Sequence, residues 1–290
     1  MKIVLIGAGG QLGTALTKRL GEVILPLGRD ALDLSDADSV RPVLTREAPH
    51  LVINAAAYNF VDRAEDESEK AFVINARGPW ALARACRDRD IPLVHVSSDY
   101  VFGRDTGRTV PYVESDAPGP QSQYARGKLA GEVFVQTVCP KHFILRTCGL
   151  YGRAVSPGKG NFVETMLRLG KERGAVSVVD DQWCTPTSAA DLARWIAELI
   201  ATDKHGLYHA TNSGSTTWCR LAREIFRQAG MTVEVTPITT ARFGAKAPRP
   251  AYSVLDCTKL AQAVGHPLRP WQEALAEYLA SRPADAATRS

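Results

Sequence analysis

The chain opens with the stretch Ile3-Val4-Leu5-Ile6-Gly7-Ala8-Gly9-Gly10-Gln11-Leu12-Gly13. Its first four residues are a short, continuous apolar run, which is typical of a strand buried on both faces of a parallel sheet. The glycines at positions 7, 10 and 13 allow a tight turn and let the backbone approach a bound phosphate closely. A helical pattern then continues to Leu20. Strand, glycine loop and helix in this order predict a binding site for the diphosphate of a dinucleotide.

Further apolar runs follow along the chain, and helical patterns separate most of them. We predict strands at residues 23–27, 51–53, 92–96, 142–146 and 206–210. Strands that alternate with helices favour a parallel sheet covered on both faces, because each crossover returns the chain through a helix. The predicted fold is therefore α/β, a doubly wound parallel sheet of the Rossmann type with a smaller C-terminal substrate lobe.

The regular alternation of strands and helices ends near Gly149. We expect residues 1–148 to form the dinucleotide-binding domain, rejoined by about 188–212. Residues 149–187 and 213–281 are expected to form the substrate-binding lobe. The small, polar tail at residues 282–290 is expected to be disordered.

Composition restricts the class of protein. The 290 residues are 45% hydrophobic and 23% charged, as in globular domains, and the net charge of +4 is too small to indicate nucleic acid or a membrane surface as a partner. The six cysteines form no C-x-x-C pair, which favours a reducing compartment. No apolar run reaches the roughly 18 residues that a spanning helix needs. We expect a cytoplasmic protein.

No group of side chains predicts a metal site. The segment from Asp62 to Lys70 is strongly charged, but its carboxylates do not share one face with other ligands. We interpret it as the solvated start of a helix. Magnesium is compatible with the chain but is not indicated by it.

The residues at the end of the second strand indicate which dinucleotide, NADPH or NADH, is preferred. It carries Gly28-Arg29-Asp30, where the ribose of a bound cofactor would lie. An arginine there accommodates a 2′-phosphate, and an acidic residue favours a free 2′-hydroxyl. On the basis of Arg29 we expect NADPH to be preferred, with NADH as the alternative.

Two other strands deliver polar or small residues to their carboxyl ends, where open α/β sheets bind ligands. Asn54-Ala55-Ala56-Ala57-Tyr58 follows the third strand, and its small residues allow either a flat ring or a packed helix against the backbone. Ser97-Ser98-Asp99-Tyr100 follows the fourth. His95 lies inside that strand, so we interpret it as a core residue and not a catalytic one.

Tyr124 and Lys128 are four residues apart and so share one face of a predicted helix. An ammonium beside a phenol stabilises the phenolate, which lowers the tyrosine pKa and assists proton transfer. Gly127 and Gly131 have the same spacing and permit a close approach of backbones. Packing against the sheet and a contact in a homodimer are both open interpretations of this glycine pair.

Taken together, the glycine loop, Ser98 and Tyr124-x-x-x-Lys128 resemble the extended short-chain dehydrogenase/reductase superfamily. More specifically, the chain resembles the dTDP-4-dehydrorhamnose reductase family, from residue 1 to about 265. The stretches that carry this resemblance are Gly10–Gly13, Asn54–Tyr58, Val61–Glu65, Ser98–Phe102, Leu145–Thr147, Gly160–Val163, Asp181–Gln182, Pro186–Thr187 and Arg249–Ser253.

The resemblance implies reduction of the C4 ketone of a nucleotide-linked 4-keto-6-deoxysugar, most specifically dTDP-4-dehydro-L-rhamnose. Tyr124 would protonate the C4 oxygen, Ser98 would donate a hydrogen bond to it, and Lys128 would lower the Tyr124 pKa and hold the nicotinamide ribose. Around these catalytic residues, Asp99, Tyr100 and Trp183 would line the sugar pocket, and Asn161 and Arg249 would hold the diphosphate. The cofactor set implied is Gly7, Gly10, Gln11, Leu12, Gly13, Arg29, Asp33, Leu34, Ala55, Ala56, Ala57, Tyr58, Tyr124 and Lys128.

Two positions depart from the family pattern. Ser98 stands where the family usually has threonine, and it keeps the hydroxyl. Gly149 stands where the family normally has a tryptophan that packs on the sugar. Position 183 is typically glycine in the family, so Trp183 suggests that an indole has been exchanged across the pocket. Two unrelated substitutions are the other interpretation.

Other functions remain open at this point. A reductase of a different nucleotide 4-keto sugar fits the same motifs. Sugar 4,6-dehydratases need an Asp-Glu pair after the hydroxyl residue, but Asp99 is followed by Tyr100. A non-catalytic, reductase-like regulatory subunit would bind cofactor without turnover, and the intact Ser98, Tyr124 and Lys128 argue against it.

Overall fold

The computed structural model describes residues 1–154 and 160–282. Its centre is a six-stranded parallel sheet in the order β10-β5-β4-β3-β1-β2. The strands are β1 (Ile3–Ile6), β2 (Ile24–Leu27), β3 (Leu51–Asn54), β4 (Leu93–Ser98), β5 (His142–Thr147) and β10 (Gly206–His209). All six predicted strands are present, and the doubly wound parallel α/β fold is confirmed.

The strand order reverses between β1 and β3. From β1 the chain moves first outward to β2 and then back across to β3 on the other side of β1. The crevice above such a reversal is where open α/β sheets bind ligands, because the crossovers on its two sides leave in opposite directions. The fold therefore places the glycine loop after β1 beside the segment after β3.

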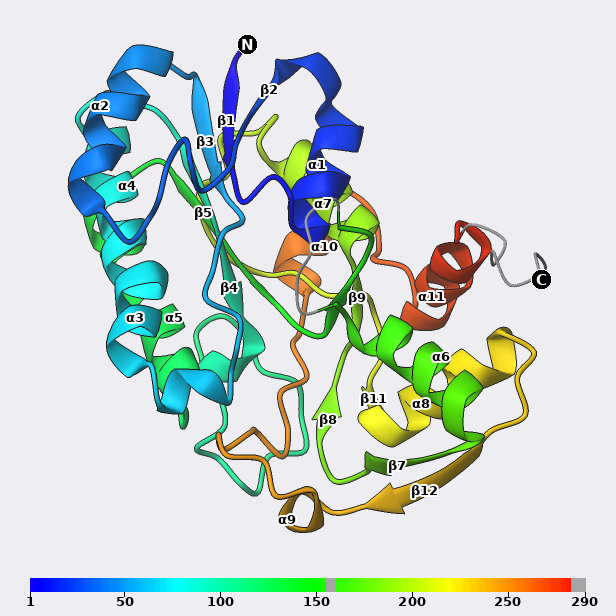
Figure 1. Ribbon diagram of the computed structural model, residues 1–290. Helices are drawn as coiled ribbons and strands as arrows, with labels where there is room; N and C mark the ends of the chain where they lie inside the picture. The colour runs from blue at the N-terminus through cyan, green and yellow to red at the C-terminus, as the bar shows by residue number, and fades with distance from the viewer. Residues whose placement is uncertain (155–159, 283–290) are drawn as a thin grey trace.

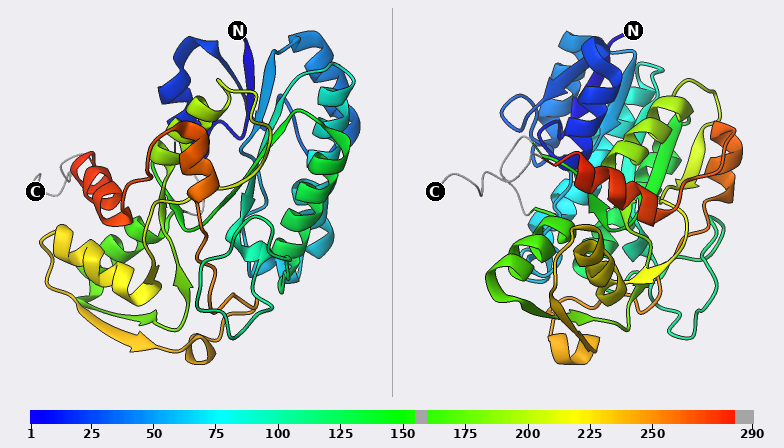
Figure 2. Two further views of the ribbon diagram at one scale, coloured as in Figure 1. Left: turned by 180° about the vertical axis from the view of Figure 1, so that it is seen from behind. Right: turned by 90° about the vertical axis from the view of Figure 1, so that its right-hand side faces the viewer.

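Helices cover both faces of the sheet (Figures 1 and 2). One face carries α1 (Gln11–Leu20), α7 (Ala189–Leu199) and α10 (Thr258–Val264); the other carries α2 (Ala37–Glu47), α4 (Gly78–Arg87) and α5 (Gln123–Val138). Successive strand residues point to opposite faces. Accordingly, Ile3 and Leu5 pack with α1 and α7, and Val4 and Ile6 pack with α2 and α4.

A smaller lobe lies below the sheet in Figure 1 and has its own apolar core. It contains α6 (Phe162–Arg173), α8 (Trp218–Gln228), α9 (Thr240–Phe243) and α11 (Trp271–Ala280), with the strand pairs β7 (Ala175–Val179) and β12 (Glu234–Ile238), β8 (Trp183–Cys184) and β11 (Thr216–Thr217), and β6 (Leu150–Tyr151) and β9 (Thr187–Ser188). The patterning did not predict β12, three of whose five residues are exposed.

The expected division of the chain needs one correction. Helix α10 falls within the predicted lobe segment 213–281, but it packs on α7 and β10, and Leu260 belongs to the same core cluster as Trp195. The physical reason is that β10 ends the sheet, and its apolar face must be covered. In the expected 282–290 tail, Arg282 bonds Glu164, and the rest lies outside the described residues. No helix in residues 1–154 and 160–282 is long and apolar enough to cross a membrane.

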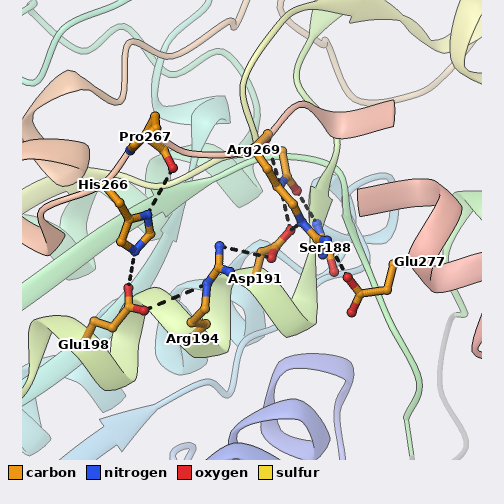
Figure 3. A network of polar contacts seen from close by, with 9 residues as sticks. Ser188, Asp191, Arg194, Glu198, His266, Pro267, Arg269 and Glu277 are labelled. Carbon is orange, nitrogen blue, oxygen red and sulfur yellow. Dashed lines mark hydrogen bonds and ion pairs between the residues drawn. The ribbon is translucent and has the colours of Figure 1, made fainter. Parts of the chain in front are cut away.

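A buried carboxylate joins the sheet domain to the segment that leads into α11 (Figure 3). Asp191 on α7 is 3% exposed and accepts hydrogen bonds from Arg269 Nε at 2.7 Å and from Asn212 Nδ2 at 2.8 Å. Arg269 also bonds Glu277 on α11, and Arg194 lies 3.5 Å from Asp191. One carboxylate thus holds α7 and the chain before α11 in register.

We predict that Asp191→Ala lowers the free energy of unfolding by roughly 2–4 kcal/mol, because it leaves the Arg269 guanidinium and the Asn212 amide without their acceptor. Urea denaturation measures this loss. The matched control is Glu172→Ala, whose partner Arg168 is 60% exposed, so a loss below about 0.5 kcal/mol is expected. Equal losses in the two variants would contradict the assignment of Asp191 as a structural clamp.

Candidate functional site

The glycine loop packs directly against the segment after β3. Gly7 has a φ of +80°, and a Cβ added there would lie 2.7 Å from the backbone nitrogen of Ala56. A Cβ on Gly13 would lie 2.2 Å from the Gly7 carbonyl oxygen. Gly10 is the N-cap of α1, and no side chain caps that end. The bare helix N-terminus and the tight loop fit the phosphates of a dinucleotide.

Not every residue of the predicted cofactor set can use its side chain. Leu12 and Leu34 are 4% exposed and belong to the two cores of the sheet domain, so only their backbones can face a cofactor. Gln11 donates through Nε2 to the Gly160 carbonyl at 3.2 Å. Its buried Oε1 has no hydrogen-bond partner among the described residues and so remains available to a ligand donor.

The ribose end of the predicted cofactor site contains an exposed cation and a loop carboxylate. Arg29 is exposed after β2. Asp33 accepts a hydrogen bond from the Ser35 backbone N–H at 2.9 Å, and this bond lowers its pKa, with a smaller contribution from Arg29. The geometry leaves Arg29 free to reach a 2′-phosphate.

Asn75 fixes the segment Ala55–Tyr58, and the sequence reasoning missed it. Its side chain accepts a hydrogen bond from the Tyr58 N–H at 2.8 Å and donates one to the Tyr58 carbonyl at 3.0 Å. Asn75 lies in a single π-helical segment, Val73–Arg77, between α3 (Ser68–Phe72) and α4. An asparagine inside a buried helical pattern was the available signal, because asparagine is a poor helix former.

The glycines of α5 allow this helix to pack closely against the same π-helical segment. A Cβ on Gly131 would lie 2.2 Å from the Asn75 carbonyl oxygen, and one on Gly127 would lie 3.3 Å from the Asn75 Cβ. The close approach therefore occurs within one chain, between α5 and the π-helical turn. Neither the sheet nor a second copy is needed to explain this glycine pair.

Ser98 and Tyr124 meet at the carboxyl end of β4. The Ser98 Oγ accepts a hydrogen bond from the Tyr100 N–H at 3.1 Å and donates one to Asp99 Oδ1 at 3.1 Å, and the Tyr124 phenol lies beside Ser98. Burial raises the pKa of Tyr124 to about 12, although the nearby Ser98 hydroxyl opposes the shift. Tyr124 is therefore protonated at neutral pH and is poised as a proton donor.

Lys128 bonds the backbone of β4. Its Nζ donates to the Val96 carbonyl at 2.6 Å, and burial lowers its pKa to about 8, with Glu132 opposing the shift. The expected lowering of the Tyr124 pKa by Lys128 is wrong for this structure, because desolvation of the phenol dominates. His95, 1% exposed and bonded to Asn54, is a core residue as expected.

Asp99 lies behind Ser98 with three donors around it. It is 2% exposed, and it accepts hydrogen bonds from the Ser253 hydroxyl at 2.6 Å, from Ser98, and from the Cys148 thiol. Burial raises its pKa to about 6, and these hydrogen bonds limit the rise. Tyr100 meets Tyr124 edge-on, with ring centroids 6.1 Å apart. The two residues predicted for the sugar pocket thus adjoin Ser98 and Tyr124.

The two residues predicted to hold a diphosphate already have protein partners. Arg249 makes a bidentate ion pair with Asp62, at 3.0 and 2.7 Å, and also bonds Tyr100. Asn161 caps α6: its Oδ1 accepts from the Glu164 N–H at 2.9 Å, and its Nδ2 donates to the Gly152 carbonyl at 3.0 Å. Arg249 is thus held by Asp62, and the structure uses Asn161 as a helix cap.

The indole that contacts Gly149 belongs to Trp218 and not to Trp183. A Cβ on Gly149 would lie 3.3 Å from the Trp218 ring and 3.2 Å from the Pro186 Cα, and Gly149 has a φ of +52°. The Trp183 ring instead packs under the guanidinium of Arg220, 4.7 Å away. A tryptophan at position 149 would have a strained backbone and too little space. The structure therefore does not support the expected exchange of indoles between positions 149 and 183, because it is Trp218 that packs against Gly149.

In the described part of the chain, no three His, Cys, Asp or Glu side chains are arranged to hold a metal ion. The geometry instead brings together a cradle for a dinucleotide, a protonated tyrosine with a serine beside it, and a buried carboxylate. Such a set suits proton donation to an oxygen that gains negative charge.

Comparison with known proteins gives the same assignment over the whole chain. Residues 1–283 match the family model described as the RmlD substrate binding domain. A dTDP-4-dehydrorhamnose reductase of Streptomyces griseus is 43% identical over 281 residues, which cover 93% of this chain and 90% of that protein. A dTDP-4-keto-6-deoxy-D-glucose reductase of Streptomyces niveus is 40% identical and covers 93% of this chain and 94% of its own length.

A solved structure agrees in fold as well as in sequence. The dTDP-4-dehydrorhamnose reductase of Bacillus anthracis, determined in complex with NADP, superposes with a TM-score of 0.91 at 40% identity, over 97% of this chain and 100% of that one. The chain therefore belongs to the RmlD family, which is the dTDP-4-dehydrorhamnose reductase family.

Proposed function

We propose that this protein is an NADPH-dependent reductase of the C4 ketone of a nucleotide-linked 4-keto-6-deoxysugar, with dTDP-4-dehydro-L-rhamnose as substrate and dTDP-L-rhamnose as product. The observation that carries the proposal is Tyr124, a buried tyrosine beside Ser98 with its pKa raised to about 12. The names of the Streptomyces griseus and Bacillus anthracis relatives support the substrate and the cofactor.

The protein supplies orientation and a proton. NADPH, when bound, supplies the hydride. The glycine loop and the α1 N-terminus hold its diphosphate, and Lys128 holds the nicotinamide ribose. Tyr124 donates its proton to the C4 oxygen, and Ser98 lies within reach of the same oxygen. Because the site is buried, these groups act on the developing charge with little screening by water.

Arg249 reaches the sugar nucleotide by exchange. Its bidentate grip on Asp62 has the geometry that a guanidinium also uses for a diphosphate. Binding of the substrate releases Asp62 and takes its place. We call the segment that carries Arg249 and Ser253 the C-terminal strap. It would thereby link binding of the nucleotide to the carboxyl end of β4, where Ser98 lies.

A reductase acting on a different 4-keto sugar is the second candidate, and Gly149 favours it. The Streptomyces niveus relative is named for dTDP-4-keto-6-deoxy-D-glucose. The deciding experiment is NADPH oxidation with dTDP-4-dehydro-L-rhamnose and with dTDP-4-keto-6-deoxy-D-glucose at matched concentrations. A higher kcat/KM for the second sugar would reassign the substrate, and cofactor binding without turnover on either would indicate a regulatory subunit.

We predict that Tyr124→Phe lowers kcat by roughly 10²–10⁴, the usual effect of losing a positioned acid. The substitution removes one oxygen from a buried ring, so the fold and the NADPH Kd should change little. Steady-state kinetics and a fluorescence titration with NADPH measure the two quantities. A kcat within a factor of two of the unmodified protein would contradict the assignment of the proton donor.

We predict that Arg29→Ala raises the KM for NADPH by about tenfold and leaves the KM for NADH almost unchanged. The exposed guanidinium would otherwise make charge-assisted hydrogen bonds to the 2′-phosphate, worth about 1.5–3 kcal/mol. Arg19→Ala, which removes a cation from the far end of α1, is the matched control. If Arg29→Ala changes the KM for NADPH and the KM for NADH by the same factor, the assignment of Arg29 to the 2′-phosphate is contradicted.

We predict that Trp218→Ala raises the KM for the sugar nucleotide by about tenfold or more and changes the KM for NADPH by less than about twofold. The Trp218 ring lies against Gly149, next to Cys148 and hence to Asp99, and its loss would leave a large gap beside the sugar. Trp183→Ala is made in parallel. A larger sugar effect from Trp183→Ala would assign the pocket wall to that residue instead.

A further inference from the structure

The environment of Asp99 contains donors but no cation. Three neutral groups from three segments donate to its carboxyl: the Ser98 hydroxyl after β4, the Cys148 thiol after β5, and the Ser253 hydroxyl on the C-terminal strap. No lysine, arginine or histidine forms an ion pair with it anywhere in residues 1–154 and 160–282. A carboxyl group buried in this way can hold or release a proton without breaking an ion pair.

Ser98 has one hydrogen and two lone pairs, and this count limits what it can do. An ionised carboxylate only accepts, so while Asp99 is charged the Ser98 hydrogen points to Oδ1 at 3.1 Å. One of its lone pairs then takes the Tyr100 N–H. In that state the Ser98 hydrogen is not directed at a ketone oxygen.

Protonation of Asp99 reverses the arrangement. The carboxyl proton on Oδ1 can donate to the Ser98 Oγ, which still accepts from the Tyr100 N–H. Both lone pairs of Ser98 are then used, and its own hydrogen is released. The oxygen of a bound ketone can accept from it.

We propose that Asp99 is a positioning residue whose protonation turns the Ser98 hydroxyl toward the ketone oxygen. This inference rests on the proposed function. No group is consumed: Asp99 keeps its proton through the reaction, and the proton delivered to the C4 oxygen comes from Tyr124.

The tyrosine and histidine side chains near Asp99, and the Cys148 thiol, have pKa values far from that of Asp99. Burial holds the Asp99 pKa at about 6, whereas the pKa of Tyr124 on α5 is about 12 and those of Tyr100 and Cys148 are raised well above their usual values. On the same helix as Tyr124, Glu132 is paired with Arg146, and Lys128 has a pKa of about 8. Arg249 interacts with Tyr100, and Cys184 interacts with Cys148. Burial lowers the pKa of His95 far below its usual value.

The test is the pH dependence of a single turnover, followed as NADPH oxidation between pH 5 and 8. In the unmodified protein the rate should rise as the pH falls through the Asp99 pKa. The rise can approach about 10²-fold, the effect of one donor to a developing oxyanion. Asp99→Asn should remove this limb, because the amide donates to Ser98 at every pH.

Ser253→Ala gives a second, independent arm. It removes a 2.6 Å hydrogen bond that favours the charged carboxylate, so the inflection should move up by about one pH unit. Ser97→Ala is the matched control: the buried Ser97 Oγ has no hydrogen-bond partner within the described residues, and the inflection should stay in place. An unchanged inflection in Ser253→Ala, or a limb retained in Asp99→Asn, would overturn the proposal.

An optical measurement separates this inference from the proposed function. Infrared difference spectra between pH 7 and pH 5 should contain the carbonyl band of a buried, protonated carboxyl, and Asp99→Asn should lack it. If the unmodified protein reduces neither sugar at any pH, the proposed function fails whatever the spectra contain. If it reduces a sugar but the band is absent, or does not track the rate, the role of Asp99 fails alone.

Discussion

The structure depends first on a contact between two backbones at the reversal point of the sheet. Gly7, at the end of β1, leaves no room for a Cβ against Ala56, at the end of β3. Gly13 closes the same junction from α1. Because three backbones meet there, the helix N-terminus, the glycine loop and the segment Ala55–Tyr58 have one relative position. Everything proposed for the cofactor relies on that position.

Burial, more than ion pairing, sets the chemistry of the site. The same desolvation that raises the pKa of Tyr124 and of Asp99 lowers the pKa of Lys128. Each shift favours the neutral form of its group, because a charge in a poorly solvated site is costly. Of these three groups, Tyr124 is neutral at pH 7, whereas Asp99 and Lys128 stay mostly charged because their pKa values lie only about one unit from 7.

The sequence predicted the features that local rules control. The apolar runs predicted the six strands of the sheet, and the glycine spacing predicted the loop after β1. The sequence did not predict the features that depend on contacts between distant segments of the chain. The bond between Arg249 and Asp62 joins residues 187 apart, and Trp218 reaches Gly149 across the lobe. The direction of the Tyr124 pKa shift also could not be predicted, because spacing along a helix does not report how deeply a phenol is buried.

The π-helical turn at Val73–Arg77 can be understood as one residue inserted into an otherwise continuous helix. Each α-helical residue advances the side chains by about 100°, so an added residue rotates everything beyond it by that angle relative to everything before it. This rotation allows α3 and α4 to face different neighbours while Asn75 points at Tyr58. With one residue fewer in this segment, the chain would form a regular helix. Either α3 or α4 would then be rotated away from its present neighbours. The length of this segment, and not only its composition, is therefore part of what positions the cofactor loop.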